Sequence, residues 1–145
     1  MCMYQYSLYL VHEESFSFLP WIHIKEHMQK AIAYNHGELS FEDYKERILD
    51  KRYQLWLDWN HHTSHIRGVG VSRFIEEEKI VRILLYSNES SGTFIRNMEF
   101  FEDWCLRFGA VEIEFWGREG WKKALAPAGF SHKFTVMSKK IGERL

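Results

Sequence analysis

The stretch GREGWKKALAPAGF, residues 117–130, reads as a short amphipathic helix that runs into a glycine turn. Pro127 cannot continue a helix, because its ring removes the amide hydrogen and clashes with the preceding turn. Gly129 supplies the left-handed conformation that commonly ends a helix. Phe130 then folds back onto an apolar core. The stretch therefore predicts a helix over 118–126 that ends in a sharp turn.

Hydrophobic periodicity assigns the other elements. Two helices are expected between residues 16 and 50, separated by Gly37, and Ser40 followed by Asp43 indicates the cap of the second one. A long helix is expected over 92–110. Strands are expected over 4–11, 53–60, 66–75, 79–87, 111–116 and 132–141.

The expected order is β-α-α-β-β-β-α-β-α-β, with the three central strands in an antiparallel meander. Helices that alternate with strands in this way cover a central mixed sheet, so the fold class is α/β (α+β). A length of 145 residues, without repeats or a linker, predicts one domain over 1–145.

Composition narrows the possible partners. The 19 basic and 20 acidic residues form no charged block, so nothing indicates nucleic acid or an anionic membrane. No apolar run reaches the roughly 18 residues of a membrane span. With Cys2 and Cys105 alone, no disulfide framework is expected, and a reducing cytoplasm is the natural compartment. Aromatic residues make up 17% of the chain, enough to build the core and also to contact a protein partner or a second copy.

The Ala-Gly-Phe sequence at 128–130, the strand expected after it and the order of elements together resemble the GNAT superfamily of acyl-CoA-dependent N-acetyltransferases. The resemblance implies a GNAT-like fold, acetyl-CoA as the cofactor and an amine acceptor on a small molecule or protein. After Phe130 the chain has room for one strand where the family builds two. Residues 117–130 also resemble small GNAT-like proteins of tailed bacteriophages, some of them virion components, which implies the host cytoplasm or the virion as location.

The turn ESSGTF, residues 89–94, falls where the family binds the cofactor pyrophosphate. The family pattern is Gln or Arg, two free positions, Gly, one free position, and Gly or Ala, because bare main-chain amides must approach the phosphates closely. Glu89 and Phe94 depart from that pattern. On the alternative interpretation Ser91 or Thr93 caps the helix and Phe94 packs in the core. The cofactor-binding residues implied by the resemblance are Ser90, Ser91, Gly92 and Thr93.

The family's usual general acid is a tyrosine at the position that Leu125 occupies here, and leucine cannot donate a proton. Tyr86, near the end of a predicted strand, is the candidate substitute. Glu112 and Glu114 share one face of the strand 111–116 and are candidates for the general base, unless they are solvated charges. Two further candidates of the same kind are Asp58 and His65.

Histidines occur in two groups, His61, His62 and His65 in a polar turn, and His23 and His27 four residues apart on a helix. Imidazoles in such spacings can bind Zn²⁺. The helical pair lacks the glutamate of a metalloprotease motif, so polar turn and surface roles are preferred and no metal is expected.

Two hypotheses for function follow. The first is an acyl-CoA-dependent N-acetyltransferase with a degenerate cofactor turn. The second is a catalytically inactive GNAT-like fold that binds proteins, as a phage structural or host-interacting module. The element order favours the first hypothesis, and Glu89, Phe94 and Leu125 favour the second.

Overall fold

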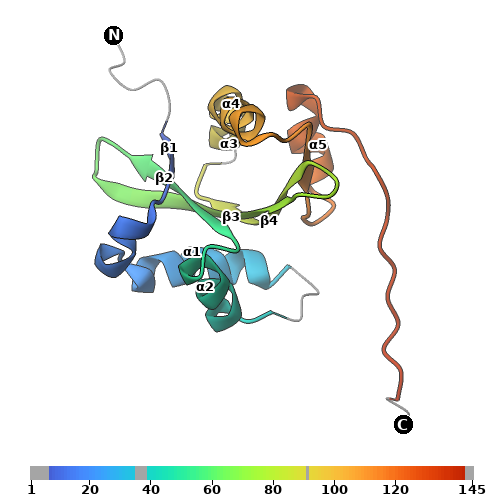
Figure 1. The fold of residues 1–145 in the computed structure, drawn as a ribbon, viewed down its shortest axis with the longest axis horizontal. Helices are drawn as coiled ribbons and strands as arrows, with labels where there is room; N and C mark the ends of the chain where they lie inside the picture. Colours follow the sequence, from blue (N-terminus) through green and yellow to red (C-terminus); the bar gives the residue numbers. More distant parts are fainter. Residues whose placement is uncertain (1–6, 35–38, 91, 143–145) are drawn as a thin grey trace.

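The computed structural model describes residues 7–34, 39–90 and 92–142. Residues 4–6 of the first predicted strand, Gly37 and Ser91 lie outside these ranges. The described chain forms one sheet with helices on both faces, and an extended segment leaves the body after the last helix (Figure 1).

The sheet has the order β1-β2-β3-β4-β5. Its first four strands are antiparallel to their neighbours, which confirms the predicted meander, and β5 runs parallel to β4. The strands are β1 (Leu8–Leu10), β2 (Gln54–Asn60), β3 (His65–Ile75), β4 (Ile80–Asn88) and β5 (Glu112–Phe115).

Two groups of helices cover the two faces of the sheet (Figure 1). The first group is α1 (Trp21–Ile32) and α2 (Phe41–Leu49), preceded by the 3₁₀ turn η1 (Glu13–Phe18). The second is α3 (Thr93–Arg96), α4 (Met98–Phe108) and α5 (Trp121–Leu125), followed by η2 (Ala126–Ala128). Each group closes its own apolar cluster against the sheet, so the predicted mixed sheet flanked by helices is confirmed.

The capping and turn residues identified in the sequence end and begin helices at the expected positions. Ser40 caps α2 by accepting the Asp43 amide, and the Asp43 carboxylate accepts the Ser40 amide in return. Gly129 adopts a left-handed conformation with φ of 92° directly after η2. Phe130 then packs against the cluster under α3, α4 and α5, as predicted.

A β-bulge interrupts β4 at Leu84. Leu85 pairs with Val71 but Ile83 pairs with Ser72, so Leu84 is the extra residue. The side-chain alternation is therefore reset. Leu84 and Leu85 both contact the cluster under α1 and α2, while Ile83 belongs to the opposite cluster.

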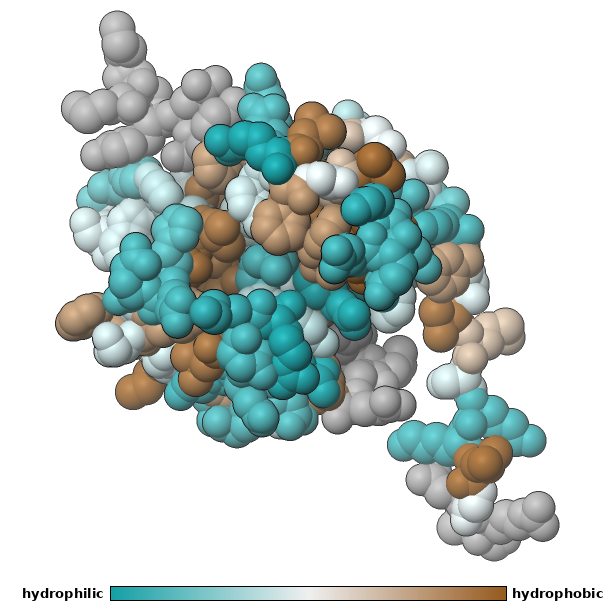
Figure 2. Space-filling model, in the orientation of Figure 1, coloured by the Kyte–Doolittle hydropathy of each residue, from teal (hydrophilic) through white to brown (hydrophobic). Residues whose placement is uncertain are grey.

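Two predicted elements need correction. The helix expected over 92–110 is divided at Asn97 into two, and the Asn97 side-chain amide competes with the main chain for the Thr93 carbonyl, to which it donates at 2.8 Å. The strand expected over 132–141 is not formed, because within the described chain this segment pairs with no other strand. Its apolar side chains are exposed, and Figure 2 shows hydrophobic and hydrophilic residues along the extended segment.

Candidate functional site

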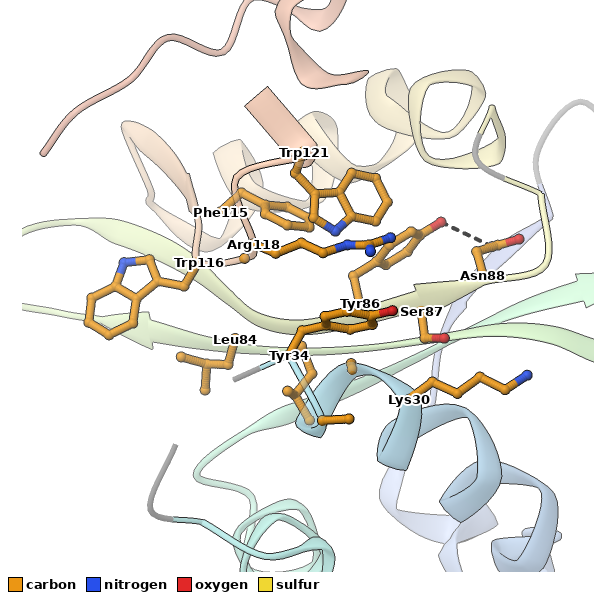
Figure 3. Close-up of a pocket in the computed structure, with 14 residues that line it drawn as sticks. Lys30, Tyr34, Leu84, Tyr86, Ser87, Asn88, Phe115, Trp116, Arg118 and Trp121 are labelled. Atoms are coloured by element: carbon orange, nitrogen blue, oxygen red, sulfur yellow. Dashed lines mark hydrogen bonds between the residues drawn. The ribbon is translucent and has the colours of Figure 1, made fainter. Parts of the chain in front are cut away.

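A cleft opens where β4 and β5 diverge. Their parallel pairing ends at Ile83 and Phe115, where the Trp116 amide donates to the Ile83 carbonyl at 2.9 Å. Beyond this point β4 continues to Asn88, whereas the segment after β5 turns away towards α5. A cavity of about 420 Å³ lies between them and extends to the end of α1 (Figure 3).

The walls of the cleft come from three parts of the chain (Figure 3). The last turn of α1 and the residues after it contribute Lys30 and Tyr34, the last part of β4 contributes residues 84–88, and the end of β5 with the segment after it contributes aromatic rings and Arg118. The Arg118 guanidinium lies 4.2 Å from the centre of the Tyr34 ring, a cation–π contact that holds this cation across the cleft.

Main-chain groups of β4 also face the cleft. The Glu89 amide donates to the Arg67 carbonyl of β3 at 2.9 Å, and Ser87 and Val69 are register partners. Because main-chain groups alternate between the two edges of a strand, the main-chain amides of Tyr86 and Asn88 point to the edge of β4 that faces away from β3. Among the described residues, no strand pairs with that edge beyond Ile83.

The cofactor-binding role of the turn after β4 stays a prediction, but the structure shows how its described residues are arranged. The Ser90 amide donates to the Asn88 side-chain oxygen at 2.8 Å. Gly92 is exposed, and a Cβ added there would meet nothing within 4 Å, so a ligand can approach its main chain. Thr93 is fully buried and its hydroxyl donates to the Ser90 carbonyl at 2.6 Å, so this hydroxyl does not face a ligand.

Phe94 is part of the core, as the alternative interpretation proposed. Its side chain is 6% exposed, and its ring centre lies 4.9 Å from that of Tyr86 and 5.5 Å from that of Phe115. Leu125 is buried in the same cluster. Two of the three positions at which the sequence departs from the family pattern, Phe94 and Leu125, therefore serve packing here.

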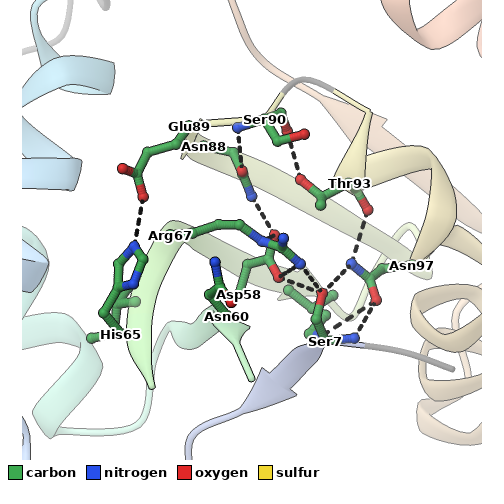
Figure 4. A network of polar contacts seen from close by, with 12 residues as sticks. Ser7, Asp58, Asn60, His65, Arg67, Asn88, Glu89, Ser90, Thr93 and Asn97 are labelled. Atoms are coloured by element: carbon green, nitrogen blue, oxygen red, sulfur yellow. Dashed lines mark hydrogen bonds and ion pairs between the residues drawn. The ribbon is translucent and has the colours of Figure 1, made fainter. Parts of the chain in front are cut away.

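The carboxylate of Glu89 points away from the turn. It lies 3.3 Å from the His65 ring of β3, and Figure 4 shows it on the far side of Asn88 from Thr93. This orientation reduces the repulsion that a carboxylate at position 89 would exert on a phosphate bound at the turn.

A buried polar network holds the turn from below (Figure 4). Asp58 is 1% exposed and accepts hydrogen bonds from Ser7, Arg67 and Asn88. Arg67 reaches Asp58 because it is the extra residue of a bulge in β3, where Asp58 pairs with Gly68 and the next residue of β2 pairs with Ile66.

Glycine at position 68 is required by this network. A Cβ there would overlap the Asn88 side-chain amide that donates to Asp58. Asn97 completes the network by accepting the Ser7 amide at 2.9 Å. The sequence singled out Asp58 as a candidate base, but the structure shows a carboxylate fully engaged by donors and shielded from solvent. Gly68 thus permits the close approach of the Asn88 side chain to β3, beside the bulge at Arg67.

Tyr86, the candidate acid, lines the cleft with its ring while its hydroxyl accepts the Asn88 amide at 3.0 Å. Burial, together with the negative charge of Asp58, raises the pKa of the Tyr86 hydroxyl well above its usual value. The hydroxyl therefore keeps its proton throughout the physiological range.

The two candidate bases on β5 are engaged in ion pairs. Burial raises the pKa of Glu114, but hydrogen bonds from Lys133 and Arg82 outweigh it, and the net pKa lies below the usual value. The Arg82 Nε to Glu114 Oε1 distance is 2.7 Å. Glu112 also binds Lys133, at 2.7 Å. Neither glutamate is among the described residues that line the cleft.

The histidines are dispersed. His61 contacts Tyr9, His65 contacts Glu89, and His27 is buried with its Nε2 atom 3.3 Å from the Ile66 carbonyl oxygen. Within residues 7–34, 39–90 and 92–142, no group of three or more histidine, cysteine or acidic side chains is arranged to hold a metal ion. The same ranges contain no helix with the length and apolar character needed to cross a bilayer.

The tryptophans are used mainly inside the domain. Trp56 is 2% exposed and contacts Trp104 edge to face, with ring centres 4.9 Å apart. Trp116 is 41% exposed, beside the cleft. A protein partner bound through exposed aromatic residues stays a prediction.

Comparison with known proteins bears on the fold. No model of a protein family matches the sequence, and no curated protein matches it significantly. Solved structures do match. A GNAT family acetyltransferase from Staphylococcus aureus is 18% identical with a TM-score of 0.59, and the match covers 92% of this chain and 97% of that one.

Two further matches are of the same kind. Glucosamine-6-phosphate N-acetyltransferase from Arabidopsis thaliana is 12% identical over 92% of this chain and 97% of its own, with a TM-score of 0.61. A predicted acetyltransferase from Clostridium acetobutylicum, solved with acetyl-CoA, is 9% identical over 92% and 95%, with a TM-score of 0.62. With its five-stranded mixed sheet, its divergent β4 and β5 and these matches, the chain has the fold of the GNAT acetyltransferases.

Proposed function

We propose that this protein transfers an acyl group from acyl-CoA to an amine in the cleft between β4 and the segment after β5. The observation that carries the proposal is the divergence of the two strands, which leaves an unpaired main-chain edge along a cavity of about 420 Å³. That volume falls within the range of small-molecule sites. The similar structure from Clostridium acetobutylicum was solved with acetyl-CoA.

The unpaired edge of β4 suits the acyl donor. The main-chain groups of Tyr86 and Asn88 can hydrogen-bond the amide-bearing arm of CoA as an additional strand would. The exposed main chain at Gly92 is the proposed contact for the pyrophosphate. The Ser90 amide already donates to the Asn88 side chain, so Ser90 is proposed to contribute through its hydroxyl, and Ser91 stays a prediction. Thr93 is left out, because its hydroxyl is buried and bonded to Ser90.

The chemistry needs little from side chains. The amine nitrogen attacks the thioester carbonyl, a C–N bond forms, the C–S bond breaks and the amine loses a proton. The thiolate is a stable leaving group, because a thiol has a pKa of about 8.5. A positioned general acid at Leu125 is therefore dispensable. The raised pKa of Tyr86 makes its hydroxyl a hydrogen-bond donor rather than an efficient acid.

The acceptor is proposed to carry an anionic group beside its amine. The described lining of the cleft contains two cations, Lys30 and Arg118, and no aspartate or glutamate. Nearby cations disfavour an ammonium ion, so they lower the pKa of a bound amine. The reactive unprotonated amine is then present without a general base such as Glu112 or Glu114. The similar Arabidopsis enzyme is named for glucosamine 6-phosphate, an amine that carries a phosphate.

Acetyl-CoA binding tests the proposal. At a ligand concentration about 100 times Kd, binding adds about 2.7 kcal/mol to stability. For a domain of this size that raises Tm by roughly 5–11 °C. Ala33→Trp, which fills the cleft from the end of α1, should abolish this shift, and Gln29→Trp, on the same helix but outside the cleft, should keep it.

Turnover is then measured as thiol release with amines that do or do not carry a carboxylate or phosphate. The absence of a Tm shift in the unmodified protein would overturn the acyl-CoA site. Equal shifts in both tryptophan variants would place the ligand outside this cleft.

A binding module without catalysis is the second candidate, because Phe94 and Leu125 occupy the family's functional positions with core side chains. This second candidate would be supported if none of the tested amines gave thiol release. The resemblance to phage proteins stays a prediction.

A further inference from the structure

Asn88 connects the buried polar network to the turn after β4. Its side-chain oxygen accepts the Ser90 amide at 2.8 Å, and its side-chain amide donates to Asp58 and, at 3.0 Å, to the Tyr86 hydroxyl. Figure 4 shows the side chain between Asp58 and Ser90. Both polar atoms of Asn88 are therefore engaged, by partners on β2, on β4 and in the turn.

Asp58 holds Asn88 from inside the domain. This carboxylate is 1% exposed, and it also accepts hydrogen bonds from Ser7 and Arg67. Asn88 is packed as well as bonded, because a Cβ added at Gly68 would lie only 2.2 Å from its side-chain nitrogen. Buried polar networks whose members are all satisfied are rigid. The position of the Asn88 side chain is therefore set by the interior of the sheet, before any ligand binds.

The turn itself is held on both sides of the contact with Asn88. The Glu89 amide donates to a carbonyl of β3 at 2.9 Å, and the Thr93 hydroxyl donates to the Ser90 carbonyl at 2.6 Å. Between these two contacts Asn88 holds the Ser90 amide. Gly92, the exposed residue proposed to contact the pyrophosphate, directly precedes Thr93. A main chain that is ordered in advance loses less entropy when it binds a ligand.

We infer that Asn88 is a positioning residue for the acyl donor, whose side chain, held by Asp58, sets the turn at which the pyrophosphate of acyl-CoA binds. The inference rests on the proposed acyl-CoA site and names the side chain that gives this site its shape. It also separates the two halves of the donor. The phosphates depend on the turn and hence on the Asn88 side chain, whereas the amide-bearing arm pairs with main-chain groups of β4 that a side-chain substitution leaves in place.

Calorimetric titration with two acyl donors tests this separation. Acetyl-CoA carries the pyrophosphate, and S-acetylpantetheine carries the same amide-bearing arm without any phosphate. Asn88→Ala should raise the Kd of acetyl-CoA about tenfold, because a main-chain contact to a charged group is weakened. The Kd of S-acetylpantetheine should change by about twofold or less. Circular dichroism at the temperature of the titration verifies that the variant is folded.

Ser7→Ala is the matched control. Ser7 donates to Asp58 as Asn88 does, and its side-chain hydrogen bonds to described residues go to Asp58, Arg67 and Asn97 rather than to the turn. This variant should be less stable than the unmodified protein, because the network loses a member. The ratio of the Kd values for the two donors should nevertheless stay the same. That ratio therefore distinguishes positioning of the turn from a general loss of stability.

Asn88→Ser keeps the inference testable if the alanine variant does not fold. A serine hydroxyl can accept the Ser90 amide in the same kind of turn, but it is too short to reach Asp58. The Kd of acetyl-CoA should then rise by less than in Asn88→Ala, again with little change for S-acetylpantetheine.

The outcomes separate this inference from the proposed function. An unchanged Kd of acetyl-CoA in the folded Asn88 variants, an equal loss for both donors, or the same change of ratio in Ser7→Ala would overturn the role of Asn88 and leave the acyl-CoA site standing. If the unmodified protein binds no acetyl-CoA, the proposed function and this inference both fail.

Discussion

Replacing Phe94 by alanine is expected to cost about 3–5 kcal/mol of unfolding free energy, the usual range for a phenylalanine removed from a packed core. The structure places this substitution in that range, because the ring is 6% exposed and is packed among Tyr86, Phe115 and Trp121. Each kcal/mol lowers Tm by about 2–4 °C in a domain of this size, so a fall of roughly 6–20 °C is expected.

The measurement is urea unfolding followed by tryptophan fluorescence, with calorimetry for Tm. Phe18→Ala is the matched control, since the same ring is removed from a side chain that is 85% exposed. Exposed substitutions of this kind change stability by about 0.5 kcal/mol or less. If Phe94→Ala costs no more than Phe18→Ala, Phe94 is not a core residue, and the reason given for its departure from the family pattern fails.

Two further predictions concern buried polar groups. Burial lowers the pKa of His27 below 6.5, so the unfolded chain binds a proton that the folded one refuses, and stability should fall as pH drops below about 6.5. His27→Leu should flatten that dependence in urea midpoints measured across this range, whereas the exposed His23→Leu should leave it unchanged; equal slopes in all three proteins would contradict the assignment. Asn88→Ala should cost about 1–3 kcal/mol, because it removes a donor from buried Asp58. Asn88→Asp should cost more stability at neutral pH, and part of that stability should return in acid. If neither substitution changes the urea midpoint, the network is not stabilising.

The parts of the fold that depend on neighbouring residues could be predicted from the sequence. Ser40 with Asp43 marks the start of a helix and Gly129 marks the end of one, since each acts through its own main chain. The meander follows from alternation within each strand. The prediction that the turn after β4 borders the site came from the resemblance to the GNAT family and not from residue spacing.

Pairings between distant residues could not be predicted. The network of Asp58, Arg67 and Asn88 depends on a bulge in β3 and on the register of β4, and neither leaves a mark in local periodicity. The interpretation of 132–141 as a strand followed from its apolar residues, but a strand also needs a neighbouring edge, and this segment pairs with none in the described chain. Glu114 was a plausible base from alternation, but its engagement by Lys133 requires the course of the segment after Phe130.

Position 68 carries a practical consequence for engineering. Substituting an interior strand glycine with alanine or valine is a standard route to a more stable sheet, because it restricts the unfolded chain and adds strand propensity. In this protein the added methyl group would displace the Asn88 amide and strip a donor from a carboxylate that has no access to water. A substitution chosen by propensity would thus loosen the turn that borders the cleft, and thermostabilisation of this chain has to begin elsewhere.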